Sequence, residues 1–413
     1  MRDIQGEECN YMEQIREKFI KTAERFNFSL MEPTPLEMLS TLELKSGAGI
    51  GNETYSFTDK GGRKVGLRFD LTVGLARFVC QRRDLKMPTK LSSYGGVWRY
   101  DEPQAGRYRY FHQWDVEIFG SFSNEADSEI IQLVVTFLNS LGLNVIVEMN
   151  HRKVIETYVT EKLGIAEVPT ISEMLRAVDK LSRKTPEQVV DEYRGRLDPL
   201  KLRELIDFSR FKGKPEQCPA TNILDGIKGW NDMLEIFDSM KSRNINNVRL
   251  NFGIVRGLDY YSGFVFEVLE KDKSAALVGG GRYDMLPAAF GRKDIGATGA
   301  AGGVERILAA MENQKVLDIN FKSPIYVAYS SEHVKNKAIQ IVSFLRENGH
   351  IVDYGFEAKA IKRQINDGIS RNASVIILVE EKDLRKDFVT IRNDRGEEKK
   401  IRITNIVEAI RAD

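Results

Sequence analysis

The chain contains little cysteine and no long apolar run. Its 413 residues include three cysteines, which lie far apart in the sequence at Cys9, Cys80 and Cys218. This odd and scattered set argues against a disulfide framework and against a clustered zinc site, and it is typical of a reducing cytosol. No apolar run approaches the roughly 18 residues of a membrane-spanning helix, and the sequence begins MRDIQGEE without an apolar signal segment. We therefore expect a cytoplasmic protein.

The chain also has no excess charge of either sign. Its 61 basic side chains stand against 60 acidic ones, for a formal net charge of +1. A balanced total neither requires nor excludes nucleic acid, because local patches decide such binding. The sequence lacks a phosphate loop of the GxxxxGK[ST] type, since the glycines of Gly47–Gly51 precede no helical pattern. The length is sufficient for two or three domains.

The most informative stretch runs from residue 95 to 120 and reads GGVWRYDEPQAGRYRYFHQWDVEIFG. Two alternating runs, Tyr94–Tyr100 and Phe111–Phe119, flank a polar loop, which predicts two strands and a long connection. On the second run, the period of two places Gln113, Asp115 and Glu117 on one face. The opposite face carries His112, Trp114, Val116 and Ile118.

Three arginines accompany this polar face: Arg99 on the first run, and Arg107 and Arg109 in the loop. Guanidinium groups suit phosphate oxygens, whereas carboxylates suit an ammonium or an imidazole N–H. Their convergence predicts a ligand that carries both signs of charge, such as an amino acid that meets a nucleotide. A solvated strand face is the alternative interpretation.

A second candidate lies in the predicted strand Lys64–Thr72, where Arg68, Asp70 and Thr72 share one face. An aspartate beside a threonine is suited to hold an ammonium group. The alternative is that Asp70 caps the helix that follows it.

Three further segments combine glycine with charged or phenolic side chains. RGLDYYSGFVFEVLE crowds Arg256, Tyr260 and Tyr261 between two strand-like runs. In VGGGRYDML, three glycines before Tyr283 allow a close approach of the backbone to a ligand, although a tight turn is the alternative. In GATGAAGGVERIL, Arg306 falls in the first turn of a helix, where the helix dipole disfavours a cation, and this indicates placement for a ligand.

The remaining segments indicate separate modules. Residues 152–246 are rich in Lys, Arg and Glu at helical spacing, with helix starts at Thr185 and Asp198. After a polar linker, the pattern from residue 322 alternates strands with helices. One predicted helix there carries several cations, which suit a nucleic-acid backbone or simply form a solvated helix face: Lys359, Lys362, Arg363 and Arg371.

These motifs, in this order, resemble those of the histidyl-tRNA synthetases, a family of class II aminoacyl-tRNA synthetases. The stretch from 95 to 120 looks like their motif 2 and GATGAAGGVERIL like motif 3, while RGLDYYSGFVFE and GGGRYD look like the two segments specific to the histidine enzymes. LRFDLT is similar to the archaeal and eukaryotic branch. Asp115 departs from the glycine of many bacterial members.

The resemblance implies an α+β fold in which a six-stranded antiparallel sheet flanked by helices forms the catalytic core. It divides the chain into a class II core at 1–151 and 247–314, a helical insertion domain at 152–246 and an α/β anticodon-binding domain at 322–413. Motif 1, around Phe19–Pro35, would form the interface of a homodimer.

The resemblance also implies histidine–tRNA ligase chemistry, with ATP, L-histidine and the histidine-specific tRNA as partners and Mg²⁺ arriving with ATP rather than in a protein-only metal site. Arg256 and Arg99 would be the catalytic residues, and ATP would contact Arg99, Arg107 and Arg306. Histidine would be held by one larger set of side chains: Asp70, Thr72, Gln113, Glu117, Arg256, Tyr260, Tyr261 and Tyr283.

Two alternatives remain at this stage. One is the histidine-sensing regulatory subunit of ATP phosphoribosyltransferase, which shares the core. The presence of Arg256 and of a complete C-terminal domain argues against it. The other is an RNA-binding module without catalysis, against which the complete set of pocket residues argues.

Overall fold

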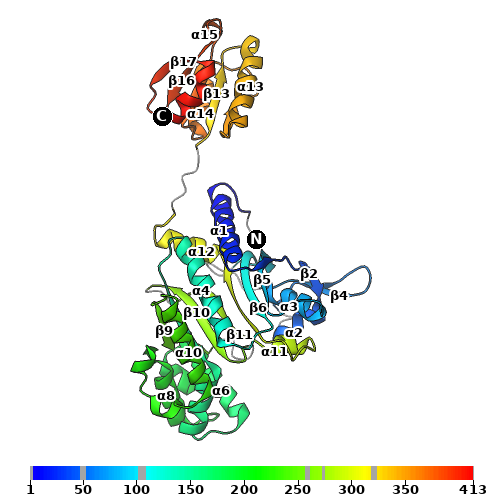
Figure 1. The fold of residues 1–413 in the computed structure, drawn as a ribbon, viewed down its shortest axis with the longest axis vertical. Coiled ribbons are helices and arrows are strands. Elements are labelled where there is room, and N and C mark those ends of the chain that lie inside the picture. Colours follow the sequence, from blue (N-terminus) through cyan, green and yellow to red (C-terminus); the bar gives the residue numbers. More distant parts are fainter. Residues whose placement is uncertain are drawn as a thin grey trace. The chain divides into compact units, whose positions relative to one another are not determined.

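A computed structural model describes residues 3–46, 53–100, 108–255, 261–271, 275–317 and 323–412 of the chain. The chain forms two compact units, Met1–Leu317 and Asp318–Asp413 (Figure 1). Because the first unit carries all the residues predicted to bind histidine or ATP, its central sheet is the frame of the site.

The first unit is built on a nine-stranded sheet with the order β1-β5-β6-β12-β11-β10-β7-β9-β8. Its six middle strands are antiparallel throughout: β5 Thr89–Trp98, β6 Tyr110–Phe119, β12 Ala297–Gly303, β11 Ala276–Arg282, β10 Phe264–Glu270 and β7 Val145–His151. The edges add three short strands: β1 Ser29–Leu30, β9 Val248–Asn251 and β8 Lys212–Gly213. The predicted six-stranded antiparallel sheet is therefore confirmed as the centre of a wider one.

One face of this sheet is covered by three helices: α1 Glu7–Arg25, α4 Asn124–Ser140 and α12 Val304–Asn313 (Figure 1). Trp114 of β6 packs there against Phe19 and Phe137, with ring centroids 5.3 and 5.2 Å apart. Because side chains alternate along a strand, burial of Trp114 against the helices directs Gln113, Asp115 and Glu117 to the opposite face. The predicted alternation of β6 is confirmed.

One sequence prediction about the surrounding segments is wrong. The predicted strand Lys64–Thr72 ends early, as β4 Lys64–Leu67, and Thr72 begins helix α3, Thr72–Gln81. The strand ends where its pairing ends, since Leu67 lies opposite Leu36, the first residue of the partner strand. The Arg68 guanidinium beyond it turns inward and donates to the carbonyl oxygens of Gly96 at 2.8 Å and of Pro33. A small sheet pairs β4 with β2 Leu36–Met38 and β3 Ser56–Thr58, beside α2 Leu39–Ser46.

For the glycines of VGGGRYDML, the structure excludes the alternative of a tight turn. They form no turn, because residues 279–281 lie inside β11, with β10 and β12 paired on its two sides. The short helix α11, Met285–Ala289, follows after Arg282.

Between β7 and β9 in the sequence, the chain forms a module of helices: α5 Arg152–Thr157, α6 Val168–Asp179, α7 Pro186–Glu192, α8 Pro199–Ser209, α9 Thr221–Leu224 and α10 Lys228–Ser242. The predicted helix starts are confirmed, since Thr185 and Gln188 form a capping box and the Asp198 carboxylate accepts from Leu200 N at 2.8 Å. This helical module shares the compact unit of the sheet, and α10 packs on α4 and α5.

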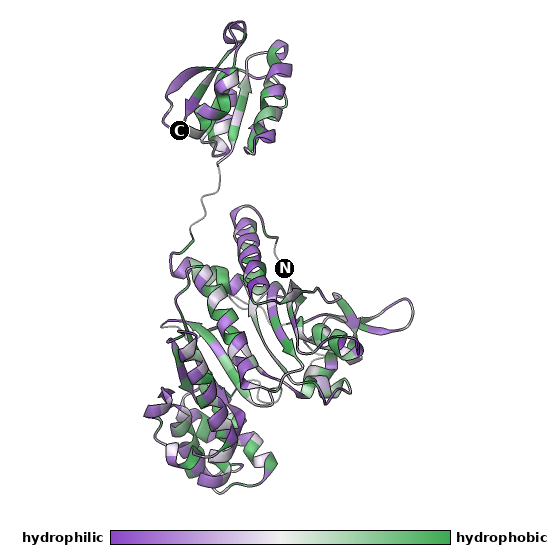
Figure 2. Cartoon of the chain, in the orientation of Figure 1, coloured by the Kyte–Doolittle hydropathy of each residue, from purple (hydrophilic) through white to green (hydrophobic). Residues whose placement is uncertain are grey.

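The second unit has a five-stranded sheet with the order β14-β13-β15-β16-β17. Its strands are β13 Ile325–Tyr329, β14 Val352–Tyr354, β15 Val375–Val379, β16 Phe388–Asn393 and β17 Glu398–Arg402. Its helices are α13 Glu332–Glu347, α14 Ile361–Ser370, α15 Glu381–Leu384 and α16 Ile406–Ala412. Hydrophobic residues concentrate in the central strands, as Figure 2 shows, and all five residues of β13 and of β15 are buried. Within the described ranges, no helix is long and apolar enough to cross a membrane.

Candidate functional site

The site lies on the sheet face that the three covering helices leave free. Gln113, Asp115 and Glu117 point from β6 to this face, and all three are almost completely buried. Across the next strand pairing they oppose Gly303, Ala301 and Gly299 of β12. Small residues on β12 thus leave room above the sheet for the longer polar side chains of β6.

Four polar side chains form one continuous hydrogen-bonded chain along this face. Arg99 Nη2 donates to Gln113 Oε1 at 3.1 Å, and Gln113 Nε2 donates to Asp115 Oδ1 at 2.8 Å. Thr72 Oγ1, from the start of α3, donates to Asp115 Oδ2 at 3.0 Å. Both oxygens of the Asp115 carboxylate are therefore engaged, and the Gln113 amide is oriented with its oxygen towards the arginine.

Arg99 is fixed from a second side as well. Its Nε donates to the carbonyl oxygen of Phe69 at 2.9 Å, and its guanidinium carbon lies 5.0 Å from the ring centroid of Phe111. The side chain is half-buried, so the guanidinium sits at the mouth of the site. The guanidinium of Arg109 lies over the ring of Tyr100, 4.6 Å from its centroid.

Asp70 makes the contact expected of a helix cap. Its Oδ1 accepts a hydrogen bond from the backbone N–H of Val73 at 3.2 Å, inside the first turn of α3. Its negative charge also contributes to the raised pKa of Tyr261. The capping interpretation is confirmed, and a ligand role for Asp70 stays a prediction.

Two tyrosines and Glu117 form the deep end of the pocket. The Tyr283 hydroxyl donates to Glu117 Oε2, and both groups are buried. Burial raises the pKa of Tyr261, and the negative charges of Glu117, Asp115, Glu267 and Asp70 raise it further. Tyr261 therefore keeps its proton and can act as a hydrogen-bond donor. Buried carboxylates gathered around a neutral phenol favour a cationic or N–H-rich ligand.

Arg306 lies near the other end of the polar face. It occupies the first turn of α12, as predicted, and its Nη1 donates to the carbonyl oxygen of Ala276 at 3.2 Å. Its side chain is exposed and runs beside Gly303, the pairing partner of Gln113. The structure thus places Arg306 and Arg99 on either side of Gln113.

Three predicted site residues lie outside the described part of the chain: Arg107, Arg256 and Tyr260. Their roles stay predictions. The other predicted residues are brought to one face of the sheet, with Asp70 and Thr72 at the adjoining start of α3.

Sequence reasoning assigned no ligand contact to Asp115, although the structure places it at the centre of the network. The period of two that selected Gln113 and Glu117 also selects Asp115, so the signal was present. A second unassigned group is Arg282, whose Nη2 donates to Asp127 Oδ2 at 2.9 Å and to the carbonyl oxygen of Ser123 at 2.9 Å. No periodicity points to this pair, because its members lie 155 positions apart in the sequence.

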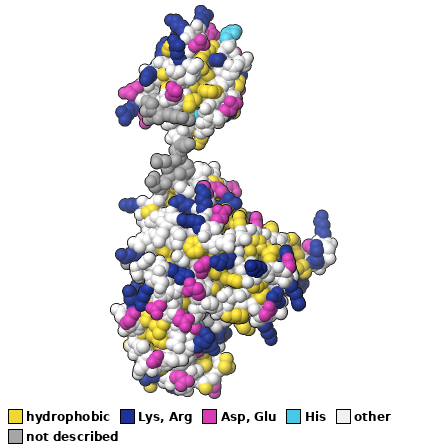
Figure 3. Space-filling view, in the orientation of Figure 1, with side chains coloured by type: hydrophobic (Ala, Val, Ile, Leu, Met, Phe, Trp, Pro, Cys, Tyr) yellow, Lys and Arg dark blue, Asp and Glu magenta, His cyan; other side chains and the backbone are white. Residues whose placement is uncertain are grey.

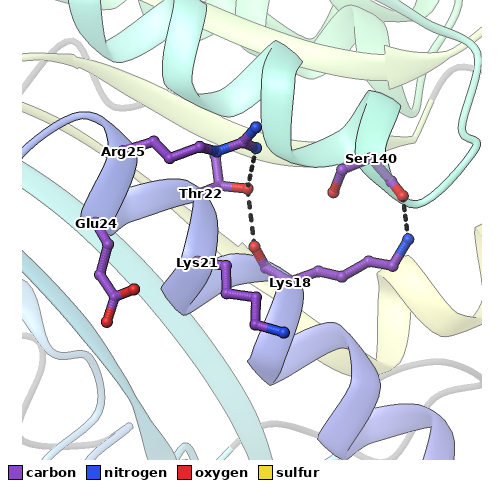
Figure 4. Close-up of a pocket in the computed structure, with 6 residues that line it drawn as sticks. All are labelled: Lys18, Lys21, Thr22, Glu24, Arg25 and Ser140. Carbon is purple, nitrogen blue, oxygen red and sulfur yellow. Dashed lines mark hydrogen bonds between the residues drawn. The ribbon is translucent and has the colours of Figure 1, made fainter.

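Two hollows accompany the site without containing its predicted side chains. One, of about 630 Å³, lies beside α1 and is lined by Lys18, Lys21, Thr22, Glu24, Arg25 and Ser140 (Figure 4). The other, of about 310 Å³, lies between the insertion helices and the sheet, with Glu148, Lys212 and Glu267 among its lining residues. Among the described residues, no cluster of three or more His, Cys, Asp or Glu side chains is arranged to hold a metal ion.

Sequence comparisons now place this geometry in a family. The family model described as Histidyl-tRNA synthetase matches residues 1–307, and the one described as Anticodon binding domain matches residues 324–413. The chain belongs to the histidyl-tRNA synthetase family. A histidine–tRNA ligase from Thermoplasma volcanium is 30% identical over 98% of this chain and 96% of its own length. One from Pyrobaculum neutrophilum is 32% identical over 95% of this chain and 93% of its own.

Solved structures share the fold at lower sequence identity. A histidyl-tRNA synthetase from a Nostoc species superposes with a TM-score of 0.83 at 18% identity, covering all of this chain and 97% of its own. A Bacillus halodurans protein described as an ATP phosphoribosyltransferase regulatory subunit/histidyl-tRNA synthetase superposes with a TM-score of 0.77 at 21% identity, covering 92% of this chain and 97% of its own. At these identities the likeness establishes the fold, and the family rests on the sequence matches.

Proposed function

We propose that this member of the histidyl-tRNA synthetase family is a histidine–tRNA ligase that works in the cytoplasm. It activates histidine with ATP and transfers the histidyl group to the 3′-terminal ribose of its tRNA. The observation that carries the proposal is the single buried face on which a carboxylate pocket, with Asp115, Glu117 and Tyr261, meets the guanidinium of Arg99. An amino acid with a cationic amine and an imidazole fits the first part, and a phosphate fits the second.

In the first step a carboxylate oxygen of histidine attacks the α-phosphorus of MgATP. A new P–O bond forms, the bond to the β-phosphate oxygen breaks, and pyrophosphate leaves with the electron pair. The site has to align the reactants and offset negative charge, which is most of what phosphoryl and nucleotidyl transfer requires. Arg99 would hold the α-phosphate against the histidine carboxylate, Arg306 and Arg107 would bind further along ATP, and Arg256 would stabilise the charge that develops at the α-phosphorus.

Recognition of the amino acid follows from the pocket at the other end of the face. Thr72, Gln113 and Asp70 would bind the amino and carboxylate groups. Glu117 would accept the N–H of one imidazole nitrogen, and Tyr261 would donate to the other, with Tyr283 closing the pocket and Tyr260 beside it. A site built from buried hydrogen-bonding groups rejects apolar side chains of similar size strongly, because its own polar groups would lose their partners.

The second step requires tRNA, and the two family matches support a division of labour. The core at 1–151 and 247–314 would carry the chemistry, the helical insertion at 152–246 would belong to the same unit, and residues 322–413 would bind the anticodon. In the second unit, Lys362 and Arg363 are exposed on α14 and suit phosphate contacts, whereas Arg371 is paired with Asp353.

A homodimer is part of the proposal. Phe19, inside the predicted interface segment, is fully buried in the core of its own chain and cannot contact a partner. Exposed apolar side chains lie instead on β1, β2, α2 and β3: Leu30, Leu36, Met38, Leu44 and Phe57. Figure 3 shows hydrophobic side chains gathered over this part of the first unit. Several exposed apolar side chains on one part of a folded chain are typical of a protein interface.

Sedimentation tests the dimer directly. Leu30→Glu should shift the protein towards monomer, because it places a charge in the apolar surface. Leu200→Glu is the matched control, since Leu200 is even more exposed, at 76%, and lies on the insertion helix α8. A monomeric wild-type protein at micromolar concentration would contradict the dimer.

ATP–pyrophosphate exchange, with one amino acid at a time, tests the enzymatic proposal. Exchange with histidine alone is the expected result. Arg256→Ala should abolish exchange while histidine binding by calorimetry persists, and the exposed ion-pair residue Arg82 offers Arg82→Ala as the control. Histidine binding without exchange in the wild-type protein would instead favour the regulatory subunit, and exchange with another amino acid would discard the roles of Glu117 and Tyr261.

A further inference from the structure

Two glycines lie in the row of directly paired residues that crosses the sheet at the deep end of the pocket. Glu117 of β6 is paired with Gly299 of β12, Gly299 with Gly281 of β11, and Gly281 with Val265 of β10. Residues paired directly across antiparallel strands present their side chains to the same face. The row therefore lacks two side chains beside the carboxylate and the phenol that the proposed function assigns to the imidazole.

At Gly299 the missing side chain is replaced by the carboxylate of Glu117. A Cβ atom at this position would overlap Oε2 of Glu117 and would approach the backbone oxygen of Val116 to 2.6 Å. The backbone of Gly299 does not adopt a positive φ. The need for glycine here is therefore a need for space rather than for an unusual backbone conformation.

At Gly281 the space is taken by the backbone of the neighbouring strand β10 and by the ring of Tyr261. A Cβ atom there would overlap the carbonyl oxygen of Phe264 and would lie 2.9 Å from Cα of Val265 and 3.0 Å from Cδ1 of Tyr261, and the residue has a φ of +154°. Both the ring of Tyr261 and the neighbouring strand thus depend on the absence of a side chain.

We propose that Gly299 and Gly281 form a trough in the sheet that seats Glu117 and Tyr261, so that Gly299 is a positioning and specificity-determining residue for histidine. The inference rests on the proposed function for the identity of the ligand, but the seat itself is a property of this chain. Glu117 displaced from the trough would lose the hydrogen bond from Tyr283 and would enter the space left for the imidazole.

Gly299→Ala tests this. We expect the KM for histidine in ATP–pyrophosphate exchange to rise on the order of 10- to 100-fold, as for the loss of a charged hydrogen bond. The KM for ATP should change less than about threefold. Gly61→Ala is the control, because Gly61 lies outside the site, in the turn between β3 and β4, has no positive φ, and a Cβ atom there meets only the side chains of Asp59 and Arg63, at 3.3 Å or more.

A double variant distinguishes two causes of a higher histidine KM: displacement of the Glu117 side chain and a general displacement of the strand at Val116. An aspartate at position 117 ends one methylene earlier, so the methyl group introduced at position 299 has less carboxylate to displace. In the Glu117→Asp background, Gly299→Ala should therefore cost at least about fivefold less in histidine KM than in the wild-type background, a departure from additivity that reports direct coupling. Equal costs in the two backgrounds, or equal increases in the KM values for histidine and ATP, would overturn the proposal.

The same variants distinguish failure of the seat from failure of the proposed function. If the wild-type protein shows no exchange with any amino acid, the proposed function is contradicted and the seat of Glu117 is not. The seat is then tested by crystal structures of Gly299→Ala and of Glu117→Asp/Gly299→Ala. A Glu117 carboxylate that stays over the introduced methyl group and keeps its contact with Tyr283 would contradict it.

Discussion

Asp115→Asn is the sharpest test of how the pocket handles charge. The carboxylate is completely buried and accepts from Gln113 and Thr72 at 2.8 and 3.0 Å. Asparagine has the same shape and can still accept from Gln113 through its oxygen. Its amide can face Thr72, whose hydroxyl is able to accept instead of donate. The variant therefore removes a negative charge and leaves the local packing in place.

The expected effect is that of removing one full negative charge close to the ligand amine. A unit charge about 6 Å from a ligand ammonium contributes on the order of 2–3 kcal/mol at an effective dielectric constant near 20. That corresponds to a rise of about 30- to 150-fold in the KM for histidine. Conversion of two charge-assisted hydrogen bonds to neutral ones should lower the free energy of unfolding by only about 1–2 kcal/mol.

The assay is histidine-dependent ATP–pyrophosphate exchange, with the KM for ATP measured in parallel and stability measured by urea unfolding. Ser93→Ala is the control: Ser93 pairs with Asp115 across β5 and β6, and its buried Oγ has no hydrogen-bond partner within the described part of the chain. A histidine KM within about threefold of wild type would refute the electrostatic role of Asp115. Equal loss of affinity for histidine and ATP would reassign it to structural support.

Three further predictions concern stability and domain function. Arg282→Leu should lower the free energy of unfolding by about 3–5 kcal/mol, because it leaves the charge of Asp127 buried and unpaired. Urea unfolding measures this change. A loss below about 1 kcal/mol would show that Asp127 finds another partner. Burial lowers the pKa of His151 to about 4, against the opposing charge of Asp232. The unfolded chain therefore binds a proton below about pH 6.5 that the folded chain does not. The free energy of unfolding should therefore fall between about pH 6.5 and 4, by up to about 1.4 kcal/mol per pH unit. His151→Asn, which preserves the helix cap, should reduce this pH dependence in urea unfolding measured across the range. An unchanged pH dependence would show that other groups cause it. A chain that ends at Leu317 should keep the rate of histidine-dependent exchange within about threefold, whereas its rate of tRNA aminoacylation should fall more than about a hundredfold. Equal losses in both assays of a folded fragment would contradict the assignment of anticodon binding to the second unit.

Sequence alone determined much of the frame. Alternation along β6 placed Gln113 and Glu117 on one face and Trp114 on the other, because a strand has a side-chain period of two. Cap chemistry at Thr185 and Asp198 located helix starts, since those contacts are local in the sequence. Family motifs supplied the six-stranded sheet and the ligand classes.

Tertiary structure decided what local patterns cannot encode. The strand at Lys64–Leu67 ends where its partner strand ends, and the glycines at 279–281 form a strand because neighbouring strands on both sides supply hydrogen bonds. Asp115 is linked to the start of α3 by its hydrogen bond from Thr72, and Gly299 is required because the Glu117 carboxylate lies over it. Both pairs are distant in the sequence. Periodicity reports which face a side chain occupies, whereas its partner on that face depends on how strands far apart in the chain are paired.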